Sequence, residues 1–106
     1  MSLLTLFVSA AILSVACSVS AADHKVIQKE MEFHPKELSI KIGDSINFVN
    51  ADIGTHNAYV SSGTFQFDLQ AQPPGSSKTV QFTREGIFEI RCAMHPRMKL
   101  KVTVAP

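Results

Sequence analysis

The sequence predicts an all-β protein, an antiparallel Greek-key β-sandwich of about seven to eight strands preceded by an N-terminal signal segment. Three observations support this prediction. From Asp23 onward, apolar and polar residues alternate in short segments, and Gly, Pro and Asp punctuate the chain between them. Residues 1–22 do not alternate in this way but form a continuous run of apolar and small residues. At 106 residues the chain can hold one small domain.

The expected strands follow one another through short turns. Gly43-Asp44 and Arg84-Glu85-Gly86 are predicted turns, and residues 61–77, rich in Ser, Gly, Gln and Pro, form a long connection. No segment has a convincing helical period, and there is no internal repeat or second domain. The predicted strands cover residues 26–27, 38–42, 45–50, 57–60, 65–69, 79–82, 87–92 and 100–104.

Residues 1–22 contain no charged side chain, and they end in the small residues Ser20-Ala21-Ala22. This pattern predicts an export signal that is cleaved after Ala22, which leaves residues 23–106 as the domain. Retention as an uncleaved membrane anchor is an alternative, because about 20 apolar residues can span a bilayer. Lipidation at Cys17 is a further alternative. Each interpretation places the domain in the periplasm or otherwise outside the cytoplasm.

The net charge and the number of cysteines exclude some classes of function. The net charge of +1 argues against nucleic-acid binding, which requires a basic surplus. After cleavage Cys92 has no partner for an intrachain disulfide. Small exported domains commonly depend on a disulfide or a metal. From the number of cysteines alone, Cys92 could be a buried inert thiol, half of an intermolecular disulfide, a catalytic thiol or a metal ligand.

The segment Cys92–Met98 combines a thiol, an imidazole and two thioethers within seven residues, between two predicted strands. A further imidazole, His56, follows another loop. One Cys, two His and one Met are the donors of a type 1 (blue) copper site, where a thiolate and two imidazoles lie in a trigonal plane beneath an axial thioether. Ligands three residues apart in a tight connection, such as Cys92, His95 and Met98, can converge on one ion.

In this order and spacing, the residues resemble the cupredoxins, and among them amicyanin, the plastocyanins and small exported methylamine-utilisation-type proteins. The Cys-x-x-His-x-x-Met spacing is similar to the short ligand loop of amicyanin. The resemblance covers most of residues 25–104. It includes Phe33-His34-Pro35, the strand and turn at 38–44, Asn50, Thr55-His56-Asn57 and Gly86.

The resemblance implies one type 1 copper ion, with His56, Cys92 and His95 as in-plane ligands and Met98 as the axial ligand. It also implies that Asn57 ties the His56 loop to the Cys92 loop by hydrogen bonds. Two positions depart from the family pattern. Met94 stands where Pro often precedes the second His, and Arg97 stands where an aromatic residue often follows His95-Pro96. Met94 also competes with Met98 for the axial role.

The implied function is to shuttle single electrons between redox protein partners, such as a dehydrogenase and a cytochrome. We expect a monomer that has no small-molecule substrate, binds no nucleic acid, and contacts a membrane only if residues 1–22 are retained. The alternative is a periplasmic copper-binding or delivery protein without an electron-transfer role. Enzymatic Cys–His chemistry is not expected, because no separate acid or oxyanion loop is visible. Structural zinc is disfavoured by Met98, and a thiol switch by the missing resolving Cys.

Overall fold

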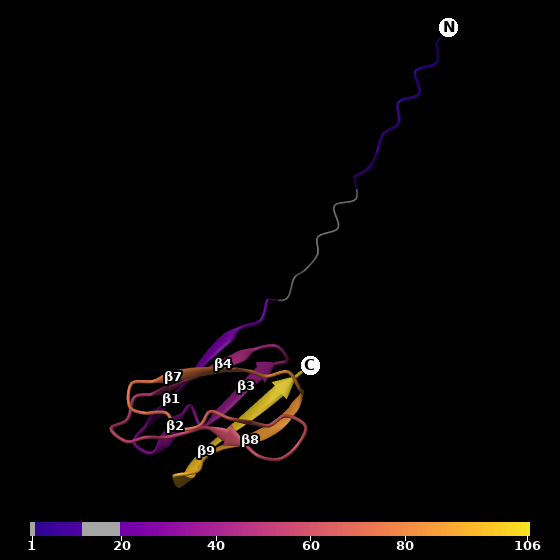
Figure 1. Ribbon diagram of the computed structural model, residues 1–106. Helices are drawn as coiled ribbons and strands as arrows, with labels where there is room; N and C mark the ends of the chain where they lie inside the picture. Colours follow the sequence, from indigo (N-terminus) through magenta and orange to yellow (C-terminus); the bar gives the residue numbers. More distant parts are fainter. Residues whose placement is uncertain (1, 12–19) are drawn as a thin grey trace.

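The protein is described here by a computed structural model that covers residues 2–11 and 20–106 (Figure 1). Its strands form a four-stranded sheet in the order β2-β1-β4-β7 and a five-stranded sheet in the order β3-β9-β8-β5-β6. No residue in the described ranges is helical, and the predicted all-β sandwich is confirmed. The strands are β1 (Asp23–Lys29), β2 (Glu32–His34), β3 (Glu37–Lys41), β4 (Ser45–Asn50), β5 (Tyr59–Val60), β6 (Phe67–Asp68), β7 (Ser77–Gln81), β8 (Gly86–Cys92) and β9 (His95–Ala105).

Two of the strand pairs are parallel. Strand β1 runs parallel to β4, with Asp23 opposite Ser45, and β3 runs parallel to β9, with Glu37 opposite Lys101. All the other pairs are antiparallel, as predicted. The alternation of apolar and polar residues is the same in both kinds of pair, so the sequence pattern does not distinguish them.

The core lies between the two sheets and follows the period-two pattern. In β9, Met98, Leu100, Val102 and Val104 are buried, whereas Lys99 and Lys101 face solvent. In β4, Ile46 and Phe48 point inward, and the Phe48 ring meets the Phe33 ring edge-on with centroids 6.2 Å apart. The Phe48 ring also lies 6.2 Å from that of Phe67, which connects it to the other aromatic rings of the core. These are Phe65, Phe82 and Phe88.

Two features near the candidate ligands differ from the sequence prediction. Strand β2 was not expected, and it forms a hairpin with β1 through the two-residue turn Glu30-Met31. Strand β9 begins at His95 rather than near Leu100, so only Ala93 and Met94 connect β8 to β9. The ligand segment is therefore a tight hairpin end, with a bulge between Arg91 and Cys92 that interrupts the regular register.

Strand β1 begins at Asp23, the residue that follows the predicted cleavage point, and cleavage after Ala22 stays a prediction. Residues 2–11 form neither helix nor strand. In the described ranges, none of the segments is a helix long and apolar enough to cross a membrane. The predicted lipidation position Cys17 lies outside the described residues.

Candidate metal centre

The four candidate ligands come from three places at one end of the sandwich. Cys92 is the last residue of β8, and His95, the first residue of β9, lies opposite it in the register. Met98 follows on the inward face of β9. His56 precedes β5, where it forms an isolated bridge with Gln72. The side chains of Cys92, His56 and Met98 are each 1% exposed, whereas His95 lies at the surface and is half-buried.

His56 faces both of the ligand candidates that flank the hairpin end. Its Nδ1 atom lies 3.9 Å from the Sγ atom of Cys92. Its ring meets that of His95 edge-on, with centroids 4.8 Å apart. Nitrogen and sulfur ligands of one ion in a trigonal plane lie roughly 3.7 Å apart if their bonds are about 2.0 and 2.3 Å long. The separation of His56 and Cys92 is therefore close to what a shared ion requires.

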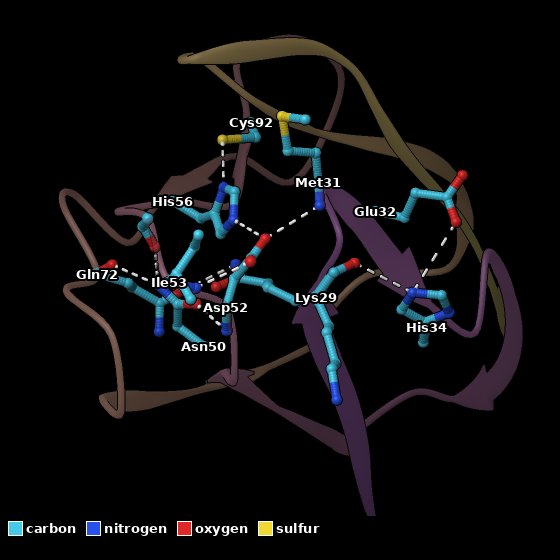
Figure 2. A network of polar contacts seen from close by, with 12 residues as sticks. Lys29, Met31, Glu32, His34, Asn50, Asp52, Ile53, His56, Gln72 and Cys92 are labelled. Carbon is cyan, nitrogen blue, oxygen red and sulfur yellow. Dashed lines mark hydrogen bonds and ion pairs between the residues drawn. The ribbon is translucent and has the colours of Figure 1, made fainter.

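Asp52 orients the His56 ring (Figure 2), and the sequence analysis did not identify it. Its Oδ2 atom lies 2.8 Å from Nε2 of His56 and 3.0 Å from the backbone N of Met31. The N–H of Met31, then His56 and the N–H of Ile53, lower the pKa of Asp52 from 3.8 to about 2. An ionised carboxylate only accepts hydrogen bonds, so Nε2 carries the proton and the Nδ1 lone pair faces Cys92. The only sequence signal for this contact was the spacing of four residues between Asp52 and His56.

Asn57 links the loop of His56 to the hairpin that holds Cys92. Its backbone N–H points at Sγ of Cys92 at 3.4 Å, and its Oδ1 atom accepts a hydrogen bond from the N–H of Ala93 at 2.7 Å. Its Nδ2 atom donates to Oδ1 of Asp68 at 3.3 Å. An N–H directed at a ligating sulfur fixes its position and tunes the electron density that it donates to a metal.

A network of buried polar groups anchors the backbone of the loop that carries His56. The backbone N and O of His56 both pair with Gln72, at 3.1 and 2.7 Å. The Nδ2 atom of Asn50 donates to the carbonyl oxygens of Gly54 and Gln72, and Nε2 of Gln28 donates to Oε1 of Gln72 at 3.0 Å. These contacts fix the loop backbone, so the direction of the His56 ring is set before any ion binds.

The structure separates the two methionines of the hairpin. Met98 is 1% exposed and belongs to the hydrophobic core, as Cys92 does, whereas Met94 is 45% exposed. In the described ranges, no three His, Cys, Asp or Glu side chains are grouped tightly enough to hold an ion without further ligands. The fit of a metal therefore depends on a mixed set: one buried thiol, two imidazoles and a thioether. That set suits a soft ion such as copper.

A comparison with protein families finds that residues 20–105 match the model "Copper binding proteins, plastocyanin/azurin family". The chain belongs to this family. It is thus a cupredoxin of the amicyanin and plastocyanin type, as the resemblance implied, and a copper-binding protein rather than an enzyme.

Several relatives of this cupredoxin are known. It is 35% identical to "Methylamine utilization protein MauL" of Methylorubrum extorquens, over 96% of this chain and 90% of that protein. It is 29% identical to "Amicyanin-alpha" of the same organism, over 94% of this chain and 87% of the other. Among solved structures, the Cu(I) form of an amicyanin variant matches with a TM-score of 0.72 and 25% identity, over 81% of this chain and 85% of that one.

Proposed function

We propose that this cupredoxin is a small exported type 1 copper protein that carries single electrons between redox proteins, with His56, Cys92, His95 and Met98 holding one copper ion. The observation that carries the proposal is the approach of Nδ1 of His56 to the buried Sγ of Cys92, 3.9 Å apart. The half-buried His95 at the surface end of the hairpin offers a short path between this buried pair and a docked partner.

The surrounding residues favour fast electron exchange because they hold the ligands in place. A bound copper ion would supply the one-electron redox couple. Asp52 fixes the ring of His56, and Asn57 fixes the hairpin of Cys92. Burial of the thiol and of Met98 excludes water from that side. A rigid, dry ligand set changes little between oxidation states, which keeps the reorganisation energy low.

The proposed location and partners rest on the leader and on the relatives. Removal of residues 1–22 as a signal would release a domain that begins at β1, in the periplasm or an equivalent compartment. One relative carries methylamine utilisation in its name. A dehydrogenase as electron donor and a cytochrome as acceptor are therefore our proposed partners, and we propose that the carrier is a monomer.

The decisive experiment is the visible and electron-paramagnetic-resonance spectrum of the Cu(II)-loaded protein. We expect intense thiolate-to-copper charge transfer and a small copper hyperfine splitting. Both should be lost in Cys92→Ser and retained in His34→Gln, a control at an exposed histidine on β2. A pale spectrum with ordinary Cu(II) splitting in the unsubstituted protein would contradict the proposed ligand set.

A second candidate function, copper binding or delivery without electron transfer, is favoured by the two exposed thioethers of Met31 and Met94 near His95. The two functions differ in whether the protein gives up only an electron or the copper ion itself. An electron carrier retains its copper through repeated reduction and oxidation, whereas a delivery protein loses Cu(I) to a competing chelator within a turnover. Copper content measured after redox cycling in the presence of bicinchoninate distinguishes them.

A further inference from the structure

A hollow of about 500 Å³ lies beside the candidate centre, between the β1–β2 turn and the start of β9. Met31 lines it from one side, and Met94 and His95 line it from the other. Strands β2 and β9 contact each other, which holds the two sides together. Met31 is 57% exposed and Met94 45% exposed, so both thioethers can be reached from solvent.

The backbone at Met31 is held in a conformation that methionine seldom adopts. Glu30 and Met31 both have a φ of 55°, in a two-residue turn where Asn and Gly are the usual residues. The N–H of Met31 is tied to Asp52 at 3.0 Å. Figure 2 shows the Met31 side chain extending from this turn on the side of Cys92 and His56. A strained turn that presents an exposed thioether beside a metal centre indicates a function for that side chain.

We propose that Met31 and Met94, together with His95, form a capture site for Cu(I) at the mouth of the centre. Thioethers are soft, neutral ligands that select Cu(I) over hard cations, and imidazole accepts both. The formal charges around the hollow cancel, with Glu30 and Glu32 against Arg97 and with Lys36 paired to Glu32 at 3.1 Å. Selection therefore depends on the thioethers and not on a general attraction for cations.

His95 connects the capture site to the inner centre, because it lines the hollow and its ring lies against that of His56. Transfer inward is an exchange of ligands without a change of oxidation state. Cu(I) leaves the two thioethers and binds Sγ of Cys92 and Nδ1 of His56. The Cys92 thiol releases its proton to water as the copper–sulfur bond forms.

The first test uses the methionine methyl groups of the protein, labelled with ¹³C. Met31, Met94 and Met98 are the three methionines of residues 23–106. The first equivalent of Cu(I), delivered as its weakly competing acetonitrile complex, is expected to shift the Met98 signal. The same titration of Cys92→Ser, which removes the thiolate of the inner centre and leaves His95 available to the outer site, is expected to shift Met31 and Met94. If neither signal moves in Cys92→Ser up to about five equivalents, which probes even millimolar binding at NMR concentrations, the capture site does not exist.

The second test is the rate at which the apoprotein loads from Cu(I)–bicinchoninate. Met31→Leu and Met94→Leu remove the thioether and keep the apolar volume. We expect each to slow loading by about fivefold or more, since fewer encounters are productive, while the final copper content stays the same. Ile87→Leu is the matched control, at an exposed apolar position of β8. Loading rates within twofold of the control in both methionine variants would overturn the proposal.

The outcomes separate this inference from the proposed function. Failure of the capture site leaves the Met98 shift and the copper charge-transfer band intact. If instead the first equivalent of Cu(I) shifts Met31 and Met94 but never Met98, the inner ligand set is wrong and the capture site stands.

Discussion

The Oδ2 atom of Asp52 lies 2.8 Å from Nε2 of His56 and also accepts the backbone N–H of Met31. This arrangement joins the β1–β2 turn to the candidate centre through one carboxylate. The side chain of Asp52 is 13% exposed, so its charge is held close to the ring of a nearly fully buried histidine. The contact sets which nitrogen of His56 is available to a metal, and the first prediction follows from it.

Replacement of Asp52 is expected to weaken copper binding and to raise the reduction potential. Carboxylates behind a ligating histidine typically contribute about 10–100-fold in metal affinity, so Asp52→Ala should approach that loss. Asp52→Asn keeps an acceptor for Nε2 but removes the negative charge that favours Cu(II), so its affinity loss should be smaller.

Competition titration and voltammetry measure these two quantities. Glu85→Gln is the control, because it removes a negative charge at an exposed turn next to β8, at the end opposite Cys92. Equal potentials in Asp52→Asn and Glu85→Gln would show that the charge of Asp52 does not act on the centre.

Asn57→Ala should lower the free energy of unfolding of the apoprotein. The substitution leaves the N–H of Ala93 without the Oδ1 acceptor that now lies 2.7 Å away. A hydrogen-bonding group that loses its buried partner costs about 1–3 kcal/mol. Asn47→Ala is the matched comparison, because Oδ1 of Asn47 is buried and has no hydrogen-bond partner among the described residues. Urea unfolding should show a clearly larger loss for Asn57; similar losses would contradict the linking role.

Asp44 should make the stability of the domain depend on acid pH. The N–H of Ala22, then His24 and the N–H of Lys41, lower its pKa from 3.8 to about 2. A carboxylate with a depressed folded-state pKa stabilises the fold fully above its unfolded pKa, and this contribution disappears as the pH falls through the folded pKa. The advantage over Asp44→Asn should therefore be complete at pH 6 and decline between about pH 4 and pH 2.

Urea unfolding at several pH values tests this expectation. Glu37→Gln, at an exposed position of β3, is the control and should follow the unsubstituted protein. Because Ala22 precedes the predicted cleavage point, a domain that begins at Asp23 lacks the first of these hydrogen bonds. The decline should then begin at the same pH and end at a higher one. An advantage that is constant down to pH 2 would contradict the assignment.

Phe82 is expected to be a major determinant of stability. It is fully buried, and its ring lies 5.2 Å from Phe65 and 5.8 Å from Phe67 between centroids. Truncation of a buried Phe to Ala costs about 3–5 kcal/mol, which is a large part of the stability of a small domain. The exposed Ile87→Ala should cost less than about 0.5 kcal/mol. Guanidinium unfolding measures both, and a small loss for Phe82→Ala would mean that the aromatic cluster can collapse around the cavity.

Most of the strands could be predicted from the sequence, because burial of one face of a strand makes apolar and polar residues alternate with a period of two. The alternation in 45–50 and 87–92 corresponds to β4 and β8, and the predicted turn at Gly43-Asp44 lies between β3 and β4. The N-terminal part of β9 was missed because Pro96 and Arg97 interrupt the apolar alternation there. Strand β2 was missed because it has only three residues.

The ligand types of the candidate centre could also be predicted from the sequence, because a thiol, imidazoles and thioethers at short spacing are uncommon and chemically specific. The residues that surround these ligands could not be predicted. Asp52 and Met31 lie 21 residues apart in the chain, and the capture hollow joins the β1–β2 turn to the start of β9. Pattern within one segment carries no information about such contacts.

The sequence by itself determined the alternating strands, the soft donor set and the uncharged run at residues 1–22, since each depends on residues that are neighbours in the chain. The tertiary structure alone decided that β1 and β3 pair in parallel, that Met98 is buried while Met94 is exposed, and that Asp52 holds His56. These outcomes depend on which sheet faces meet and on which side chains the packing leaves outside. Such choices are made by the free energy of the whole fold and not by any single segment.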